Sequence, residues 1–316
     1  MDVALPEELA PGLHTAVTIG AYDGVHVGHR RLLARTNDGA AALGVRSAVV
    51  TFDRHPATVI RPDSAPALLT DAQQKLELLG ASGVDLCVVV PFDDARADES
   101  AEDFVEEILV GALGARLVVV GDDFHFGHGR KGDTGLLREL GSRYGFDVEA
   151  VTLAARDGDA VSSTRIRSLL GDGRVEEAAT LLLRPHEVRG VVVQGDKRGA
   201  AELGYPTANV DVPLGICMPG VGIYAGWYRR ADGSTHPAAI SLGLRPTFYP
   251  DGTPGKRPVL EAFLLDFDGD LYGEAAAVSF VAKLRDELRF ENVPDLIAQM
   301  EADVTETRRV LGLSAC

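Results

Sequence analysis

Apolar runs and helix-like stretches alternate along the first half of the chain. Four short runs, rich in β-branched residues and bounded by Gly, Asp or Pro, predict buried strands at residues 15–20, 45–52, 84–92 and 116–121. Helices are predicted between and after these strands, near residues 28–43, 71–80, 100–113 and 133–144. This alternation predicts a mostly parallel sheet that is covered by helices on both faces.

The helix predicted near residues 100–113 carries both a start signal and a buried face. Asp98 or Ser100 can cap its N-terminus, and acidic residues follow in its first turn. The apolar side chains expected on its inner face are Phe104, Val105, Ile108 and Leu109.

The pattern changes after about residue 185. Strand-like runs then follow one another, separated by the turn signals ADGS, DGTPG and DGD. This arrangement favours an antiparallel barrel or a sandwich. A helix with a linker is predicted over 172–185, and a last helix over roughly 293–311. The inner stripe of that last helix would consist of Leu296, Ile297, Met300, Val304, Thr307 and Leu311.

Length and charge narrow the classes of function. A chain of 316 residues suggests about two domains, which we place at residues 1–184 and 185–316. The formal net charge of −16 argues against broad binding of nucleic acid or anionic membranes, because both need a cationic face. A small phosphorylated ligand remains compatible with this charge, since it needs only a locally basic cleft. The sequence leaves the oligomeric state open, a homo-oligomer included.

The cysteines and the N-terminal segment favour a cytoplasmic location. Cys87, Cys217 and Cys316 form an odd set without paired spacing, which fits a reducing compartment, and Cys87 lies in the apolar run LCVVV. The segment MDVALPEELAPG is acidic and broken by prolines, so we expect no signal peptide. No apolar run approaches the ~20 residues that a membrane helix requires.

Two histidines, His26 and His29, stand around a glycine in the segment GAYDGVHVGH, directly after the first predicted strand. They could be structural histidines, metal ligands or phosphate ligands. The metal interpretation is weak, because no Cys or carboxylate cluster lies nearby at ligand spacing. In the third interpretation, Gly24 and Gly28 let the backbone approach a phosphate, and a helix that begins near Gly28 directs its positive end there. Ligands of parallel sheets also bind beyond the carboxyl ends of the strands.

Polar side chains at the start of a further helix, in VSSTRIRSLL (161–170), could complete a nucleotide site. Serine and threonine are typical helix caps, and the two arginines can be solvated charges. Alternatively, Arg165 or Arg167 grips the β- and γ-phosphates, for which a planar guanidinium is well suited.

Four segments of the first half together resemble the adenylyltransferase module of the bacterial riboflavin kinase/FAD synthetase family, within the HxGH nucleotidylyltransferase group. They are GAYDGVHVGH, TFDRHP, VGDDFHFGHGRKGD and SSTRIR. In the second half, GYPTANV, SLGLRPTF, LEAFLLDF and VSFVAKLRDELRF resemble the riboflavin kinase module of the same family. The resemblance spans about residues 14 to 311. It implies a Rossmann-like α/β N-terminal domain and a C-terminal antiparallel β-barrel domain with a terminal helix.

The resemblance also implies roles for individual residues of the adenylation site. His26, His29 and Arg167 would act on the phosphates of ATP. The remaining contacts to nucleotide or flavin would come from Gly20, Asp23, Gly24, Gly28, Asp53, Asp123, Phe124, Ser162, Ser163 and Thr164.

In the kinase module, the resemblance makes Glu261 the general base and Thr207 and Asn209 the ligands of Mg²⁺ with the ATP phosphates. A hydroxyl and an amide oxygen two residues apart on an extended segment point the same way, which suits one ion, although a turn network would use them equally. Glu261 lies in the apolar strand VLEAFLL, where the alternative is a paired structural acid. Further contacts would come from Gly195, Gly199, Gly204, Pro206, Arg285 and Arg289. The segment RDELRF is either a solvated loop or a flap over the flavin.

The function implied is a two-step synthesis of a flavin cofactor from riboflavin and two molecules of ATP. The second domain phosphorylates riboflavin to FMN, and the first transfers AMP from ATP to FMN, which gives FAD and pyrophosphate without a protein nucleophile. Two residues depart from the family pattern: His125 stands where many members carry arginine, and Arg54 where proline is common. The alternatives are a weakened or re-targeted first domain, or a flavin carrier without turnover. The intact set of Thr207, Asn209 and Glu261 argues against the carrier.

Overall fold

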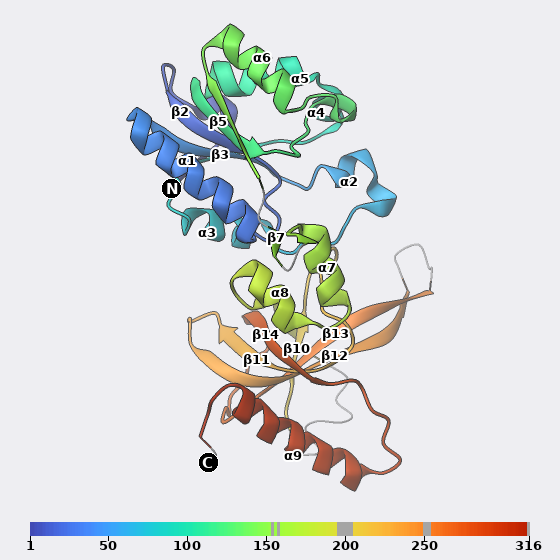
Figure 1. Ribbon diagram of the computed structural model, residues 1–316. Helices are drawn as coiled ribbons and strands as arrows, with labels where there is room; N and C mark the ends of the chain where they lie inside the picture. Colours follow the sequence, from blue (N-terminus) through green and yellow to red (C-terminus); the bar gives the residue numbers. More distant parts are fainter. Residues whose placement is uncertain (153–154, 157–158, 195–204, 249–253, 315–316) are drawn as a thin grey trace. The chain divides into compact units, whose positions relative to one another are not determined.

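The computed structural model describes two compact units, Met1–Ser163 and Thr164–Cys316 (Figure 1). The described residues are 1–152, 155–156, 159–194, 205–248 and 254–314. The units divide before the segment 164–184, which the sequence places in the first domain. The predicted boundary between the two functional domains, at residues 184 and 185, stays a prediction.

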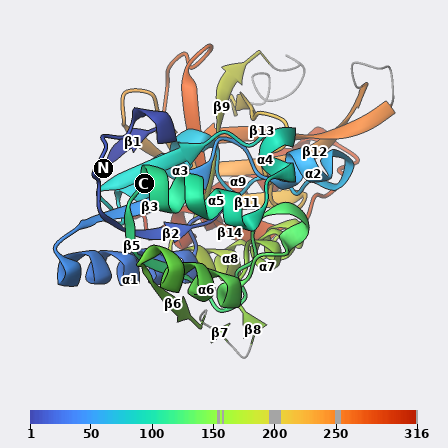
Figure 2. The same ribbon diagram turned by 90° about the horizontal axis from the view of Figure 1, so that it is seen from above.

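The first unit is built on a six-stranded parallel sheet with the strand order β1-β4-β3-β2-β5-β6. Figure 2 looks across it from β1 at one edge to β6 at the other. The strands are β1 (Asp2–Ala4), β2 (Thr15–Ile19), β3 (Arg46–Phe52), β4 (Leu86–Val90), β5 (Ala115–Gly121) and β6 (Asp147–Val151). The predicted parallel sheet is confirmed. The sequence missed both edge strands, because β1 has three residues and β6 is largely half-exposed.

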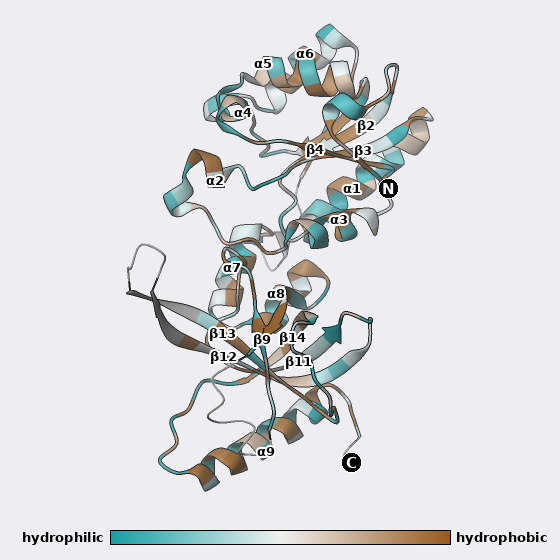
Figure 3. Cartoon of the chain, turned by 180° about the vertical axis from the view of Figure 1, so that it is seen from behind, coloured by the Kyte–Doolittle hydropathy of each residue, from teal (hydrophilic) through white to brown (hydrophobic). Residues whose placement is uncertain are grey.

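Helices cover both faces of this sheet (Figure 1), as predicted. The helices of the unit are α1 (Val27–Leu43), α2 (Ala57–Ile60), α3 (Ala72–Gly80), α4 (Asp94–Asp98), α5 (Ala101–Phe104), the π-helix η3 (Val105–Ala112) and α6 (Thr134–Tyr144). Short 3₁₀ turns lie at Pro6–Glu8, Pro62–Ser64 and His128–Arg130, and β7 (Ala155–Arg156) pairs with β8 (Asp159–Ala160). Figure 3 shows the apolar strands between helices of mixed polarity.

Alternate residues of each central strand pack toward opposite faces. Val49 and Cys87 join the core beside α1 and α3, whereas Val50 and Val88 join the core beneath α5, η3 and α6. Strands buried on both faces must be apolar throughout, which explains why they are visible as continuous runs in the sequence.

The helix predicted near 100–113 is confirmed in its start and its buried face, but its second part is a π-helix. Ser100 is the cap, since its hydroxyl accepts the backbone N–H of Asp103 at 3.0 Å. The predicted inner face is buried. The N–H of Leu113 donates to the carbonyl of Ile108 at 3.1 Å, which is the five-residue step of a π-helix.

The second unit is a closed antiparallel barrel with the strand order β10-β13-β12-β11-β14-β9. Of the two predicted alternatives, the barrel is therefore correct. Its strands are β9 (His186–Val193), β10 (Ala208–Asp211), β11 (Gly222–Arg230), β12 (Thr235–Phe248), β13 (Pro254–Leu264) and β14 (Ala275–Arg285). The helices of the described part of this unit are α7 (Ser163–Gly171), whose first residue still belongs to the first unit, α8 (Val175–Leu182) and α9 (Val293–Val310).

The terminal helix α9 lies across β11, β12 and β14. Asn292 caps it, because its side-chain oxygen accepts the N–H of Asp295 at 2.9 Å. Thr307 of the predicted inner stripe is buried, whereas Met300 and Val304 are only half-buried. The stripe is incompletely buried because part of it lines a cavity. The side chain of Asp303, which the predicted stripe did not include, is buried.

Candidate active sites

The loop between β2 and α1 holds an unusual backbone shape. Tyr22 and Val25 have φ values of 51° and 40°, and Gly24 has a φ of 84°. Positive φ is costly for a bulky or β-branched residue and persists only where the surroundings enforce it. Tyr22 is fully buried, and its hydroxyl hydrogen-bonds to that of Thr18 at 2.6 Å. The loop is thus held in one conformation by its own packing.

The two histidines of the loop stack on one another at the N-terminus of α1. Their ring centroids lie 3.7 Å apart, with an angle of 15° between the planes. His26 is the N-cap, and its Nδ1 accepts the backbone N–H of His29 at 3.4 Å. Because Nδ1 accepts, the neutral ring of His26 carries its proton on Nε2. His26 thus has a structural role through Nδ1, as the cap of α1, and a contact of its Nε2 with a phosphate stays a prediction.

His29 is kept neutral by its surroundings. Burial, and then the neighbouring His26, lower the pKa of His29 well below its usual range. Its Nδ1 is buried and has no hydrogen-bond partner within the part of the chain that the structure describes. A buried polar atom without a partner is costly, so a ligand that supplies one would be favoured. In the described residues, no group of three or more His, Cys, Asp or Glu side chains could hold a metal ion.

Asp23 fixes the loop to the segment that precedes α3. Its Oδ1 accepts the N–H groups of Leu69 at 2.8 Å and Thr70 at 3.2 Å, and the N–H of Gly24 donates to the Thr70 hydroxyl at 3.2 Å. The hydroxyl of Ser163 donates to the carbonyl of Asp23 at 3.0 Å. This bond joins Ser163, the last residue of the first unit, to the histidine loop, and the contact of Ser163 with a nucleotide stays a prediction. The roles of Ser162, Thr164 and Arg167 stay predictions.

Asp53 follows β3 and is held by three donors. Its Oδ1 accepts the N–H of Phe92 at 2.9 Å, and its Oδ2 accepts Nε and Nη2 of Arg54 at 3.1 and 3.0 Å. Burial raises the pKa of Asp53, but the Arg54 guanidinium and the Phe92 N–H together outweigh it, so the net pKa is lowered. The charge that Arg54 adds to the family pattern is thus paired with the neighbouring carboxylate.

Lys75, on α3, was missed by the sequence reasoning. Its Nζ donates to the carbonyl of Phe52 at 2.7 Å and to the hydroxyl of Thr51 at 3.3 Å, where β3 ends. Burial lowers the pKa of Lys75, and the nearby Cys87, Asp23 and Asp53 side chains partly oppose this shift. A lysine in the first turn of a helix looks like a solvated charge in sequence, so no local signal marked it.

The segment after β5 orients Phe124 toward the core of the first unit. Phe124 stacks on Phe126 with ring centroids 5.4 Å apart and packs against the core cluster. Asp123 is exposed, and its carbonyl accepts Nδ1–H of His125 at 2.8 Å. Contact of Asp123 or Phe124 with a flavin or nucleotide stays a prediction, as do the roles of Gly20 and Gly28.

A row of side chains crosses the outer face of the barrel. Asn209 lies directly opposite Glu261, Glu261 opposite Ser241, and Ser241 opposite Ile223, which in turn faces Arg285. Directly opposed residues of antiparallel strands share one face of the sheet. The chain neighbours on the inner face are buried, namely Ala208, Ile240 and Ala262. The register thus brings together Asn209 and Glu261, which lie far apart in sequence.

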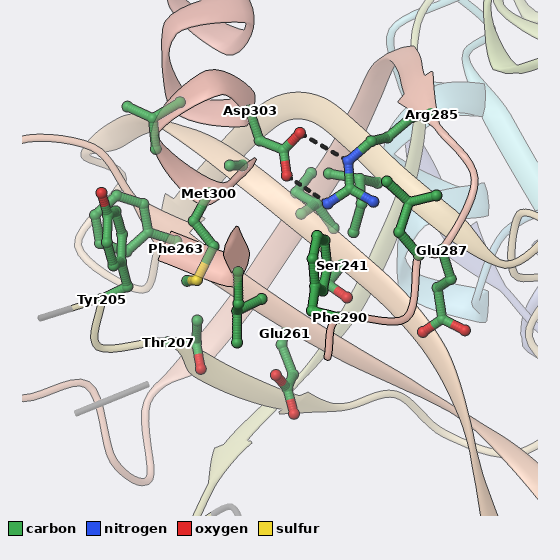
Figure 4. Close-up of a pocket in the computed structure, with 16 residues that line it drawn as sticks. Tyr205, Thr207, Ser241, Glu261, Phe263, Arg285, Glu287, Phe290, Met300 and Asp303 are labelled. Carbon is green, nitrogen blue, oxygen red and sulfur yellow. Dashed lines mark hydrogen bonds and ion pairs between the residues drawn. The ribbon is translucent and has the colours of Figure 1, made fainter. Parts of the chain in front are cut away.

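A cavity of about 320 Å³ lies between this outer face, α9 and the segment 286–292 (Figure 4). Its walls are largely apolar and aromatic. The rings of Tyr205 and Phe263 pack edge to face, with their centroids 5.1 Å apart. The main lining residues are Tyr205, Thr207, Glu261, Phe263, Leu288, Phe290, Met300 and Val304. A second cavity of about 170 Å³ is more polar and shares Ser241, Glu261 and Glu287 with the first. Glu261 therefore stands where an apolar and a polar cavity meet.

The remaining residues predicted for the kinase site do not all line the cavity, and some lie outside the described residues. Arg285 lines the larger cavity but forms an ion pair with Asp303. Arg289 and Pro206 are exposed. Gly195, Gly199 and Gly204 lie outside the described residues. Contact of any of these with a phosphate stays a prediction.

Comparison with known proteins relates both units to enzymes of flavin cofactor synthesis. A family model of FAD synthetase matches residues 11–165, and one of riboflavin kinase matches residues 182–311. The bifunctional riboflavin kinase/FMN adenylyltransferase of Pseudomonas fluorescens is 40% identical over 98% of this chain and 99% of its own. The enzyme of the same name from Escherichia coli K12 is 37% identical over 96% of this chain and 95% of its own.

The chain belongs to the bifunctional riboflavin kinase/FMN adenylyltransferase family. The predicted enzyme, with ATP as the co-substrate of both reactions, is thereby confirmed. The fold of the family extends to a solved structure of a macrolide-efflux protein from Streptococcus pneumoniae. That protein is 29% identical, with a TM-score of 0.86, and the match covers 96% of this chain and 97% of the other. Among the described residues, the structure contains no helix that is long and apolar enough to cross a membrane.

Proposed function

We propose that the cavity beside α9 binds riboflavin for phosphorylation, and that the histidine loop of the first unit binds ATP for adenylylation of FMN. The position of Glu261 carries the first assignment. A carboxylate at the junction of an apolar and a polar cavity can meet the hydroxyl end of a ligand whose ring system is buried beside it. The aromatic lining of the larger cavity suits a flat heteroaromatic ring.

In the kinase reaction, Glu261 acts as the general base. It accepts the proton of the ribityl 5′-hydroxyl while the hydroxyl oxygen forms a bond to the γ-phosphorus and the bond to ADP breaks. Asn209, directly opposite Glu261, and Thr207, which lines the same cavity, present neutral oxygen atoms beside the carboxylate. Ser241, on the other side of Glu261, offers a hydroxyl to the ligand.

Thr207 and Asn209 are the residues that would hold Mg²⁺. A hydroxyl and an amide oxygen are hard oxygen donors of the kind Mg²⁺ prefers when the nucleotide and water supply its other ligands. The ion would neutralise charge on the transferred phosphoryl group. The two residues flank Ala208 at the start of β10, so they share the outer face of the barrel with Glu261.

In the adenylylation reaction, a phosphate oxygen of FMN attacks the α-phosphorus of ATP, and pyrophosphate leaves. His26, through Nε2–H, and His29 would hydrogen-bond the phosphates. The N-terminus of the 17-residue helix α1 adds its positive end at the same place. We propose that Arg167 with Ser162, Ser163 and Thr164 holds the triphosphate.

We further propose that the protein acts in the cytoplasm on small molecules, without a nucleic-acid partner. The net charge of −16 supports the second point, and the odd number of cysteines without paired spacing supports the first. FMN is the proposed acceptor in the first unit, because the FAD synthetase family model matches residues 11–165. Arg54 pairs with Asp53, and His125 bonds to the backbone of its own turn.

Chromatography of flavins after incubation of the protein with excess riboflavin, ATP and MgCl₂ tests the assignment. The expected products are FMN and then FAD, in amounts well above that of the protein. FMN without FAD would show that the first unit is weakened or takes another substrate. Bound riboflavin without turnover would favour the carrier.

A further inference from the structure

Arg285 and Asp303 form a buried ion pair between the end of a barrel strand and the middle of α9. Arg285 Nε lies 2.8 Å from Asp303 Oδ1, and Arg285 Nη2 lies 2.6 Å from Asp303 Oδ2. Only 19% of the arginine side chain and 10% of the aspartate side chain are exposed. This two-point geometry needs a guanidinium, which presents parallel donors to a carboxylate.

Neighbouring groups complete the pair. Arg285 Nη1 donates to the carbonyl of Asp286 at 2.9 Å, and the side-chain amide of Gln299 donates to Asp303 Oδ1 at 3.0 Å. Each nitrogen of the guanidinium therefore has a partner within the protein. This arrangement is typical of a structural tether and differs from the phosphate contact that the sequence suggested for Arg285.

The pair stands at the edge of the larger cavity. Figure 4 shows Asp303 reaching from α9 to Arg285 at one side of the cavity. The chain leaves β14 at Arg285, runs through the segment 286–292 and continues into α9. The side chains that close the cavity opposite the barrel wall come from this stretch: Leu288, Phe290, Leu296, Met300 and Val304. The ion pair joins the start of the stretch to α9, so it fixes how far α9 stands from the barrel.

We propose that the Arg285–Asp303 pair positions α9 and the segment 286–292 over riboflavin, and thereby sets the affinity of the kinase site for this substrate. The pair acts as a positioning device and does not contact the phosphates. This inference rests on the assignment of the cavity to riboflavin.

Steady-state kinetics of FMN formation by the full-length chain tests the proposal, with riboflavin and ATP varied separately. Removing one partner leaves a buried charge unpaired, and small displacements in a binding site are costly. Arg285→Leu and Asp303→Leu should each raise the KM for riboflavin about tenfold, with the kcat and the KM for ATP changed less than about twofold. The double variant leaves no unpaired charge, so it should recover most of the affinity.

A matched control lies on the same helix. Glu306 pairs with Arg309 at the exposed surface, so Glu306→Gln should leave all constants unchanged. Asp303→Asn is a milder variant that preserves the shape of the side chain, and its folding can be followed by the fluorescence of Trp227 on β11, the only tryptophan of the sequence.

Three results would overturn the proposal. Arg285→Leu could lower kcat or raise the KM for ATP far more than Asp303→Leu, which would indicate a direct phosphate contact. The double variant could show the summed loss of both single variants. A folded Asp303→Asn chain could keep the original KM for riboflavin. Glu261→Gln, measured in the same assay, isolates the proposed function: full FMN formation by that variant would refute the site assignment itself.

Discussion

His186 should make the stability of the barrel depend on pH, because it is buried in its neutral form. The residue is 1% exposed, and its Nε2–H donates to the carbonyl of Cys217 at 2.8 Å. Burial lowers the pKa of His186 from 6.5 to about 4; the hydrogen bond to Cys217 opposes this shift, and the charge of Arg184 reinforces it.

The sign of the effect follows from which state binds the proton. Above pH 6.5, the histidine is neutral in both the folded and the unfolded chain, so it contributes no pH dependence. Between pH 6.5 and 4, the unfolded chain binds a proton that the folded chain excludes, so the free energy of unfolding falls as the pH falls. At about 1.4 kcal/mol per pH unit over about 2.5 units, the complete loss is about 3 to 4 kcal/mol, of which about 3 kcal/mol is reached at pH 4. Below pH 4, both states are protonated and the loss is complete.

Urea unfolding at pH 7 and at pH 4, followed through the fluorescence of Trp227, measures this loss in the barrel. His186→Met serves as the matched variant, because it cannot titrate and all other groups remain. Between pH 7 and pH 4, the free energy of unfolding should fall by about 3 kcal/mol more in the original chain than in the variant. This difference corresponds to a further decrease of roughly 1–2 M in the urea midpoint. Equal losses in the two chains would refute the reasoning.

Two further predictions concern the first unit and the barrel wall. Lys75→Met should lower FAD formation from FMN about tenfold, because the end of β3 loses the donor to the Phe52 carbonyl, while FMN formation stays unchanged; coupled assays of both steps check this. Equal loss of both activities would contradict it. Gly226→Ala should destabilise the barrel by about 3 kcal/mol or more in thermal unfolding, because the new Cβ would lie 2.0 Å from the Ser279 carbonyl oxygen. Gly171→Ala, which meets no atom within 4 Å, is the control and should unfold at the same temperature or higher.

The elements that the sequence predicted correctly are those whose burial leaves a strong pattern. The central strands of the first unit are buried on both faces, so each is a continuous apolar run bounded by turn residues. The edge strands β1 and β6 lack this pattern, because one is very short and the other is half-exposed. The choice between barrel and sandwich depends on which strands pair across the closure, here β9 with β10, and no local pattern encodes that pairing.

The candidate sites also combine features that a local sequence pattern reveals with features that depend on tertiary contacts. The stacked histidines follow from a three-residue spacing at a helix start, which is visible in sequence. The opposition of Asn209 and Glu261 depends on the register between β10 and β13, and the pairing of Arg285 with Asp303 depends on where α9 packs. Charged residues in such tertiary contacts look like solvated charges until the fold is known. The sequence therefore indicated Glu261 as a candidate base but did not indicate the pairing of Asp303 with Arg285.

We propose that each of the two reactions has its own site, and one chromatographic measurement of flavin products tests this proposal directly. Glu261→Gln should lower FMN formation from riboflavin by roughly 10²–10⁴-fold and leave the conversion of FMN to FAD intact. His29→Ala should abolish the conversion of FMN to FAD and leave FMN formation intact. Loss of both reactions in either folded variant would contradict the claim.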